Sequence, residues 1–158
     1  MAMALEVARY ILYTAYKFGD SITNLKLQKL LYYVQADYLV NHNGRPLFAE
    51  NIEAWQYGPV IREVYNVYKC FGRTPINDEC LTEQFELTSE EKEAIEDSLE
   101  QYMSYSAYEL VSNIHQEQPW IDAYEEGKDN IISTESMYNF YKSLALEKEE
   151  LLAEIEDC

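Results

Sequence analysis

Apolar residues recur every three or four positions along most of the chain, a spacing that is typical of amphipathic helices. The first such stretch covers residues 3–18 and ends at Gly19. The second begins after Thr23, whose hydroxyl can accept a backbone N–H at a helix start. It ends in residues 41–44, NHNG, which tolerate a left-handed backbone. The pattern therefore predicts two helices within the first 44 residues.

Residues that favour helix starts mark the later helices. Thr88 with Glu91, and Ser106 with Glu109, have the Ser/Thr-x-x-Glu spacing of a capping box. A proline suits the first helical turn because its missing N–H has no partner there, which marks two more starts at Pro59 and Pro119. The predicted helices in this part cover residues 59–71, 88–103, 106–116 and 119–126, and a last helix runs from about 134 to 156.

The helical period breaks in residues 45–59, RPLFAENIEAWQYGP, and in a connector at residues 73–87, where a short strand or turn is an alternative. Two short runs around FAEN (48–51) predict a small β-hairpin or extended arm. In the second run, strand alternation puts Ile52 and Ala54 on one face and Glu53 and Trp55 on the other. The predicted fold class is mainly α, a compact bundle of about seven helices with this one small β element.

Length and composition predict one domain over residues 1–158 with a real apolar core, since 47% of the residues are hydrophobic. No apolar run approaches the roughly 18–20 residues of a membrane span, and the N-terminal stretch lacks the basic start of a signal peptide. The three cysteines, Cys70, Cys80 and Cys158, lack metal-type spacing, which suits free thiols in a reducing cytoplasm. We therefore expect a cytoplasmic protein without a metal site.

Charge is distributed unevenly. Residues 1–75 contain eight Lys/Arg and six Asp/Glu, a net charge of +2, whereas residues 76–158 contain four Lys/Arg and 23 Asp/Glu, a net charge of −19. Such a field repels nucleic acid and attracts cationic proteins, so direct binding of nucleic acid is not expected. The alternative explanation is a solvated acidic surface that keeps the protein soluble.

Motifs for catalysis are missing from the sequence. His115-Gln116-Glu117 has the H-x-E form of zinc deaminases, but the downstream P-C-x-x-C that would complete the metal site does not occur. The chain also has no P-loop, no G-x-S-x-G and no G-x-G-x-x-G. We therefore predict a protein that is not an enzyme and needs no cofactor.

Tyrosine is abundant, with 15 residues. Tyrosine offers contact area with few side-chain torsions and a polar tip, which suits protein recognition. The alternative is that the tyrosines fill the core with their hydroxyls at its rim, which applies above all to Tyr32, Tyr33, Tyr38, Tyr65 and Tyr68.

Three blocks occur in a recognisable order: LKLQKLLYYVQADYL (25–39), PLFAENIEAWQYGPVIREVY (46–65) and NIHQEQPWIDAY (113–124). Together they resemble the Panacea, or SocA-like, antitoxin domain family, also seen as phage-associated proteins. The resemblance covers about residues 4–141, and residues 142–158 form an acidic helical extension. Asn24 stands where the family often has proline, which should weaken the helix start only slightly.

The resemblance implies an antitoxin that neutralises a protein toxin, encoded by a neighbouring gene, through direct binding. Alternatives within the family are an adaptor that delivers the toxin to a cellular protease and an interaction module without a toxin. The eleven residues that carry the resemblance most sharply, here called the signature residues, are the candidates for partner binding or motif structure: Lys26, Gln28, Lys29, Tyr32, Trp55, Tyr57, Gly58, Pro59, His115, Glu117 and Trp120.

Helical geometry separates the roles of these blocks. Residues 26, 28 and 29 cannot all share the buried face of Leu27, Leu30 and Leu31, because neighbours on a helix diverge by about 100°. We expect one or two of them to hydrogen-bond to residues 54–59 or to His115 and Glu117. Trp55 and Trp120 should lie close together beside the Gly58-Pro59 turn. Trp55 and Tyr57, together with this turn, should shape a groove whose rim is functional. Partner specificity is expected on the acidic helices at 89–103 and 134–156.

Overall fold

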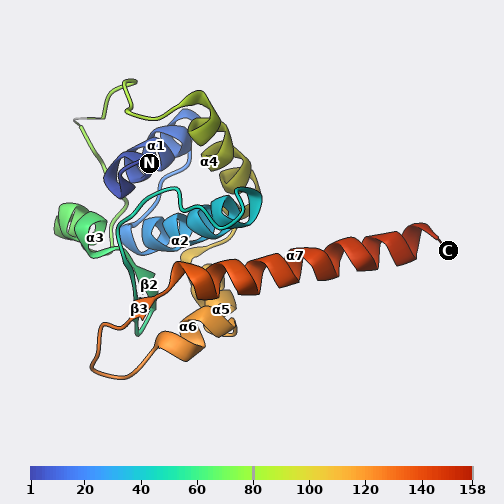
Figure 1. Cartoon of the computed structure of the whole chain (residues 1–158). Helices are drawn as coiled ribbons and strands as arrows, with labels where there is room; N and C mark the ends of the chain where they lie inside the picture. Colours follow the sequence, from blue (N-terminus) through green and yellow to red (C-terminus); the bar gives the residue numbers. More distant parts are fainter. Residues whose placement is uncertain (80, 158) are drawn as a thin grey trace.

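The structure is a computed structural model that describes residues 1–79 and 81–157. Within these residues the chain forms seven α-helices and a three-stranded sheet (Figure 1), which confirms the predicted, mainly α fold class. The helices are α1 Ala4–Lys17, α2 Asn24–Asn41, α3 Arg62–Tyr68, α4 Ser89–Tyr102, α5 Ala107–Ile114, α6 Gln118–Ala123 and α7 Thr134–Glu156. The strands are β1 Ile52–Trp55, β2 Gly58–Val60 and β3 Ile131–Ile132, and a 3₁₀ turn, Lys69–Phe71, follows α3.

Helix α2 is the centre of the molecule. It contacts α1, α3, α4, α5, α7 and β2 (Figure 1), and twelve of its 18 residues are buried. The buried set includes Leu27, Leu30, Leu31 and also polar residues, so this helix has no polar face of the usual kind. A helix enclosed on most sides can hold polar side chains only where other elements supply hydrogen-bond partners.

The helix starts predicted at Thr23, Thr88, Ser106 and Pro119 are confirmed, whereas the one predicted at Pro59 is wrong. The Thr23 hydroxyl accepts the N–H of Lys26 at 3.2 Å, and complete capping boxes begin α4 at Thr88 and α5 at Ser106. Pro119 occupies the first turn of α6. These signals were readable because each depends on residues only three or four positions apart.

The hairpin prediction was wrong in position. Strands β1 and β2 pair antiparallel with Trp55 opposite Gly58, so the turn lies at residues 56–57 and not at FAEN. Pro59 belongs to β2, and α3 begins only at Arg62. Proline is tolerated there because β2 lies at the edge of the sheet, in the order β2-β1-β3.

Strand β3 was not predicted. Its two residues pair with β1, Ile132 opposite Ile52 and Ile131 opposite Glu53. A two-residue strand is too short to show a sequence period. The predicted end of α6 at Gly127 was also late, since the helix ends at Ala123 and Gly127 lies in the following turn with φ +78°.

Helix α7 has two different halves. Its first half packs on α2 and buries Met137 and Tyr141. From Leu146 to Asp157 every residue is exposed, and Figure 1 shows this half extending beyond the rest of the molecule.

Three predictions, on membrane spans, metal sites and free thiols, can be compared with the described residues. None of the helices in residues 1–79 and 81–157 is long and apolar enough to cross a membrane. Over the same residues no group of three or more His, Cys, Asp or Glu is arranged to hold a metal ion. Cys70 is a free, exposed thiol, while Cys80 and Cys158 lie outside the described residues.

Candidate functional site

Buried polar side chains of α2 organise the region around the hairpin. Gln28, Lys29 and Gln35 are each at most 1% exposed. Every polar atom removed from water in this way needs a hydrogen-bond partner, so each side chain ties α2 to another segment. Two of these three residues are signature residues.

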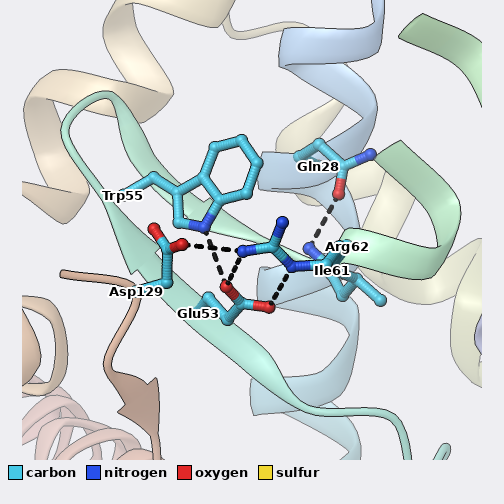
Figure 2. Close-up of polar contacts among 6 residues, drawn as sticks. All are labelled: Gln28, Glu53, Trp55, Ile61, Arg62 and Asp129. Carbon is cyan, nitrogen blue, oxygen red and sulfur yellow. Dashed lines mark hydrogen bonds and ion pairs between the residues drawn. The ribbon is translucent and has the colours of Figure 1, made fainter. Parts of the chain in front are cut away.

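Gln28 fixes the junction between β2 and α3. Its Oε1 accepts the N–H of Ile61 at 2.9 Å (Figure 2), and its Nε2 donates to Asn24 Oδ1 at 2.9 Å. Asn24 in turn donates to the carbonyl of Tyr65 at 3.3 Å. The start of α3 is thereby held by the first two turns of α2.

Lys29 fixes the hairpin itself. Its Nζ donates to the carbonyl of Pro59 at 2.8 Å, and the side chain is fully buried. Burial lowers the pKa of Lys29 to about 7. Gly58 has φ +105°, and a Cβ there would lie 2.9 Å from Lys29 Cε, so glycine is required both by the backbone and by the lysine. The expected hydrogen bond from this block to residues 54–59 is confirmed.

Gln35 was missed by the sequence analysis. Its Oε1 accepts the N–H of Leu47 at 2.8 Å and its Nε2 donates to the carbonyl of Phe48 at 2.9 Å. A signal was present, because Gln35 lies seven positions after Gln28 and therefore on the same face of α2.

A tyrosine cluster joins α2 to α4, to the start of α6 and to α7. Tyr33 donates to Glu117 Oε1 at 2.7 Å, and Tyr141 donates to the hydroxyl of Tyr32 at 3.1 Å. Burial raises the pKa of Glu117, while hydrogen bonds from Tyr33 and Tyr141 lower it in part. Tyr33 also stacks on Tyr102 of α4 with the ring centres 4.3 Å apart. For Tyr32 and Tyr33, the interpretation as core residues is confirmed.

His115 and Trp120 form a second aromatic group at the α5–α6 corner. The His115 ring stacks on Trp120 at 4.2 Å, and Trp120 stacks on Tyr124 at 4.6 Å. Trp120 Nε1 donates to the carbonyl of Trp55 at 2.9 Å, so the expected closeness of the two tryptophans is confirmed. Within the described residues, His115 Nε2 is buried without a hydrogen-bond partner.

A charged network of Glu53, Arg62 and Asp129 lies beside Trp55 of the hairpin (Figure 2). Arg62 donates to both carboxylate oxygens of Glu53, at 2.8 and 3.0 Å, and to Asp129 at 2.8 Å. The Trp55 Nε1 donates to Glu53 at 3.2 Å, and the guanidinium lies 5.3 Å from the indole ring. Burial raises the pKa of Glu53, but the bonds from Arg62 and Trp55 outweigh it and the pKa is lowered. Sequence reasoning missed Glu53, Arg62 and Asp129 as a group.

The remaining signature residues differ in exposure. Lys26 is half-buried and donates to the carbonyl of Met103 at 2.7 Å, and burial lowers its pKa. Tyr57, at the hairpin turn, is 63% exposed and is the one exposed member of the eleven. The structure thus uses most signature residues to join segments and presents only one of them openly to solvent.

Two cavities occur elsewhere on the molecule. One, of about 460 Å³, lies between α2, α4 and α7, and the other, of about 710 Å³, lies between α1 and α4. Neither is lined by any of the eleven signature residues. In particular, neither of these two cavities joins His115 and Glu117 to Lys26 or Lys29.

Comparison with known proteins adds two matches. The sequence model of the family described as "Antitoxin SocA-like, Panacea domain" matches residues 27–121, more than half of the chain. Antitoxin SocA of Caulobacter vibrioides (strain NA1000 / CB15N) is 42% identical over 69 residues, which is 44% of this chain. The matched segment spans only 36% of the length of that curated relative. No solved structure matches the chain.

Proposed function

The chain belongs to the SocA-like Panacea domain family, and from this premise we propose that it is an antitoxin that neutralises a partner toxin by binding it directly. The family match over residues 27–121 is the observation that carries the proposal. It includes α2 from Leu27 onward, the hairpin and α5, and so covers every signature residue except Lys26.

The inward role of the signature residues supports this proposal. Lys29 and Gln28 hold the hairpin and the start of α3, and Glu117 is held by Tyr33. A family fold kept by such internal contacts leaves the outer helices free to differ between members. We propose that residues 1–158 act as one unit, that partner specificity lies on α4 and α7, and that the signature residues act on binding through the scaffold.

The negative charge of α4 and α7 supports a toxin with a basic active site as the partner. Helix α4 carries six acidic residues and one lysine, and α7 carries six acidic residues and two lysines. Toxins that act on RNA or nucleotides use basic active sites, and an acidic surface would cover such a site and speed association with it. The toxin is expected to be encoded by the neighbouring gene and to meet this protein in the cytoplasm.

Membership of an antitoxin family favours a role that is not enzymatic. The inferred mechanism therefore needs no catalytic residue and no cofactor from this chain. It needs a rigid surface, and the buried hydrogen bonds from α2 supply rigidity where the hairpin and the α5–α6 corner meet.

Co-expression tests the proposal. The product of the neighbouring gene is induced alone and together with this chain, and growth is scored. We expect arrest in the first case and rescue in the second. If the neighbouring product is harmless, or if growth stays arrested although both proteins accumulate, the proposal is wrong.

A binding measurement with the purified pair separates the mechanisms. Direct blocking predicts a complex that forms at low salt and weakens at high salt, because screening reduces attraction between exposed charges. The toxin half-life in cells should then be unchanged by the antitoxin. A half-life that shortens in an energy-dependent manner would instead favour delivery to a cellular protease.

A further inference from the structure

The cleft between α2, α4 and α7 has an acidic side on α4 and also exposes apolar side chains of α2 and α7. Its α4 wall carries Glu90, Glu93 and Asp97. Val40 of α2 and Leu144 of α7 contribute apolar surface. The cleft has a volume of about 460 Å³, and its lining reaches Lys148 in the projecting half of α7. It can therefore receive side chains from a segment that lies along α7.

The apolar stripe of α7 does not stop where the bundle stops. Successive helical residues turn by 100°, so Met137, Tyr141 and Leu144 share one face, and this face packs toward α2. The same face continues through three residues of the projecting half: Leu151, Leu152 and Ile155, which are 57%, 58% and 61% exposed. Within the described chain nothing covers this part of the stripe.

Acidic residues occupy the rest of the projecting half. By the same 100° rule the stripe is flanked on one side by Glu147 and Glu154 and on the other by Glu149 and Glu156, while Glu150 lies on the far face. One cation, Lys148, lies within the stripe at the edge of the cleft, where its charge acts on Asp37. An apolar stripe bordered by acids is the pattern of one helix of a two-helix interface whose other helix is basic.

We propose that the cleft and the exposed stripe together bind an amphipathic helix of a partner protein that carries Lys or Arg beside its apolar residues. The apolar side chains of that helix contact Leu151, Leu152 and Ile155, and its basic side chains face the acidic walls formed by α4 and α7. The bound length, from Tyr141 to Ile155, is about 20 Å at 1.5 Å per residue. That the partner is a toxin rests on the proposed function, whereas the chemistry of the surface does not.

A second copy of this chain is the competing occupant. Two copies of α7 would bring five glutamates of one against five of the other. Like charges beside a helix pair oppose association, in parallel and in antiparallel order alike. The charge of the surface therefore favours a basic partner over self-association.

A synthetic peptide tests the surface independently of any toxin. The probe is a fluorescent helix of about three heptads with leucine at a and d and lysine at e and g, and the control peptide has glutamate at e and g. Binding to the full chain is followed by fluorescence anisotropy. We expect the lysine peptide to bind and the glutamate peptide to bind at least about 100-fold more weakly. Equal binding of the two peptides would overturn the proposal.

Two matched variants locate the site on α7. Leu152→Ala removes a stripe residue, whereas Leu146→Ala removes an equally exposed leucine, 50% against 58%, from the opposite face of the same helix. Both keep a strong helix former, so circular dichroism should show unchanged helix content. We expect Leu152→Ala to weaken lysine-peptide binding about tenfold and Leu146→Ala to leave it unchanged. Equal effects would contradict the inference.

Two further measurements complete the test: the oligomeric state by sedimentation, and binding of the neighbouring gene product. If the wild-type chain is a dimer that Leu152→Ala makes monomeric, and the lysine peptide does not bind, a second copy is the occupant and the proposal fails. If the neighbouring product binds and is neutralised equally by wild type and Leu152→Ala, the antitoxin function stands and this surface is wrong. If the peptide binds as expected but the neighbouring gene product is not a toxin, this binding surface stands and the antitoxin function is wrong.

Discussion

At the scale of single residues, Lys29 makes the free energy of unfolding depend on pH. Its amine is buried and its pKa is lowered from 10.5 to about 7. Between these values the unfolded chain binds a proton that the folded protein does not, so the free energy of unfolding rises with pH from about 7 to 10. Below pH 7 both states are protonated, and this dependence disappears.

Replacing Lys29 should remove that dependence. Lys29→Met keeps the volume and the apolar stem but carries no proton, so we expect the slope of stability against pH between 7 and 9 to fall by up to about 1.4 kcal/mol per pH unit. Urea unfolding at pH 7, 8 and 9 measures it. Lys142→Met, at an exposed lysine, is the control and should keep the wild-type slope. Parallel curves for all three proteins would show that Lys29 does not titrate in this range.

The sequence could not show whether the polar signature residues of α2 point into the protein or toward solvent. Periodicity identified Leu27, Leu30 and Leu31 as buried, and the structure agrees. That Gln28 and Lys29 are buried as well depends on the hairpin, thirty residues away, closing over them. A one-dimensional pattern cannot show a helix enclosed on several sides, because it records only whether an apolar face exists.

At the scale of elements, helices with local start signals and the existence of a small β element were predictable, but the position of the hairpin turn was not. The capping boxes at Thr88 and Ser106 depend on residues three apart. Gly58-Pro59 was interpreted as a turn and helix start, since both residues favour breaks. In the protein the pair forms an edge strand instead, because Lys29 accommodates only glycine at 58 and takes the Pro59 carbonyl. Tertiary contacts therefore decide that Gly58-Pro59 forms a strand and does not form a helix start.

The loop before β1 gives a prediction at this scale. Gln35 satisfies both Leu47 N–H and the Phe48 carbonyl, and all three residues are buried. Gln35→Leu leaves both backbone groups without partners, so we expect a loss of about 2–4 kcal/mol in the free energy of unfolding. Urea denaturation provides the value. Gln116→Leu, an exposed glutamine, should change stability by less than about 0.5 kcal/mol. Similar losses in the two variants would disprove the anchoring role of Gln35.

At the scale of the whole molecule, the protein consists of a bundle organised around α2 and an arm formed by the second half of α7 (Figure 1). The sequence predicted the length of α7 correctly, because its apolar period continues to Ile155. It could not show how α2 and α4 pack against α7, and hence which part of the stripe lies inside the bundle. Only the packing of α2 and α4 reveals that boundary at about Leu146.

This boundary predicts that the arm contributes to binding and not to stability. Deleting residues 146–158 removes no buried side chain among the described residues, and it removes six acidic residues and one lysine. We expect the melting temperature to stay within about 2 °C of the full chain or to rise slightly, because repulsion within the acidic half decreases. Deletion from residue 134 onward also removes Met137 and Tyr141, each at most 7% exposed, and should unfold the protein or lower the melting temperature by more than about 10 °C. Thermal melts followed by circular dichroism compare the three chains. A large loss on the shorter deletion would mean that the arm folds back onto the bundle in solution, and the exposed stripe would then have an internal partner instead of an external one.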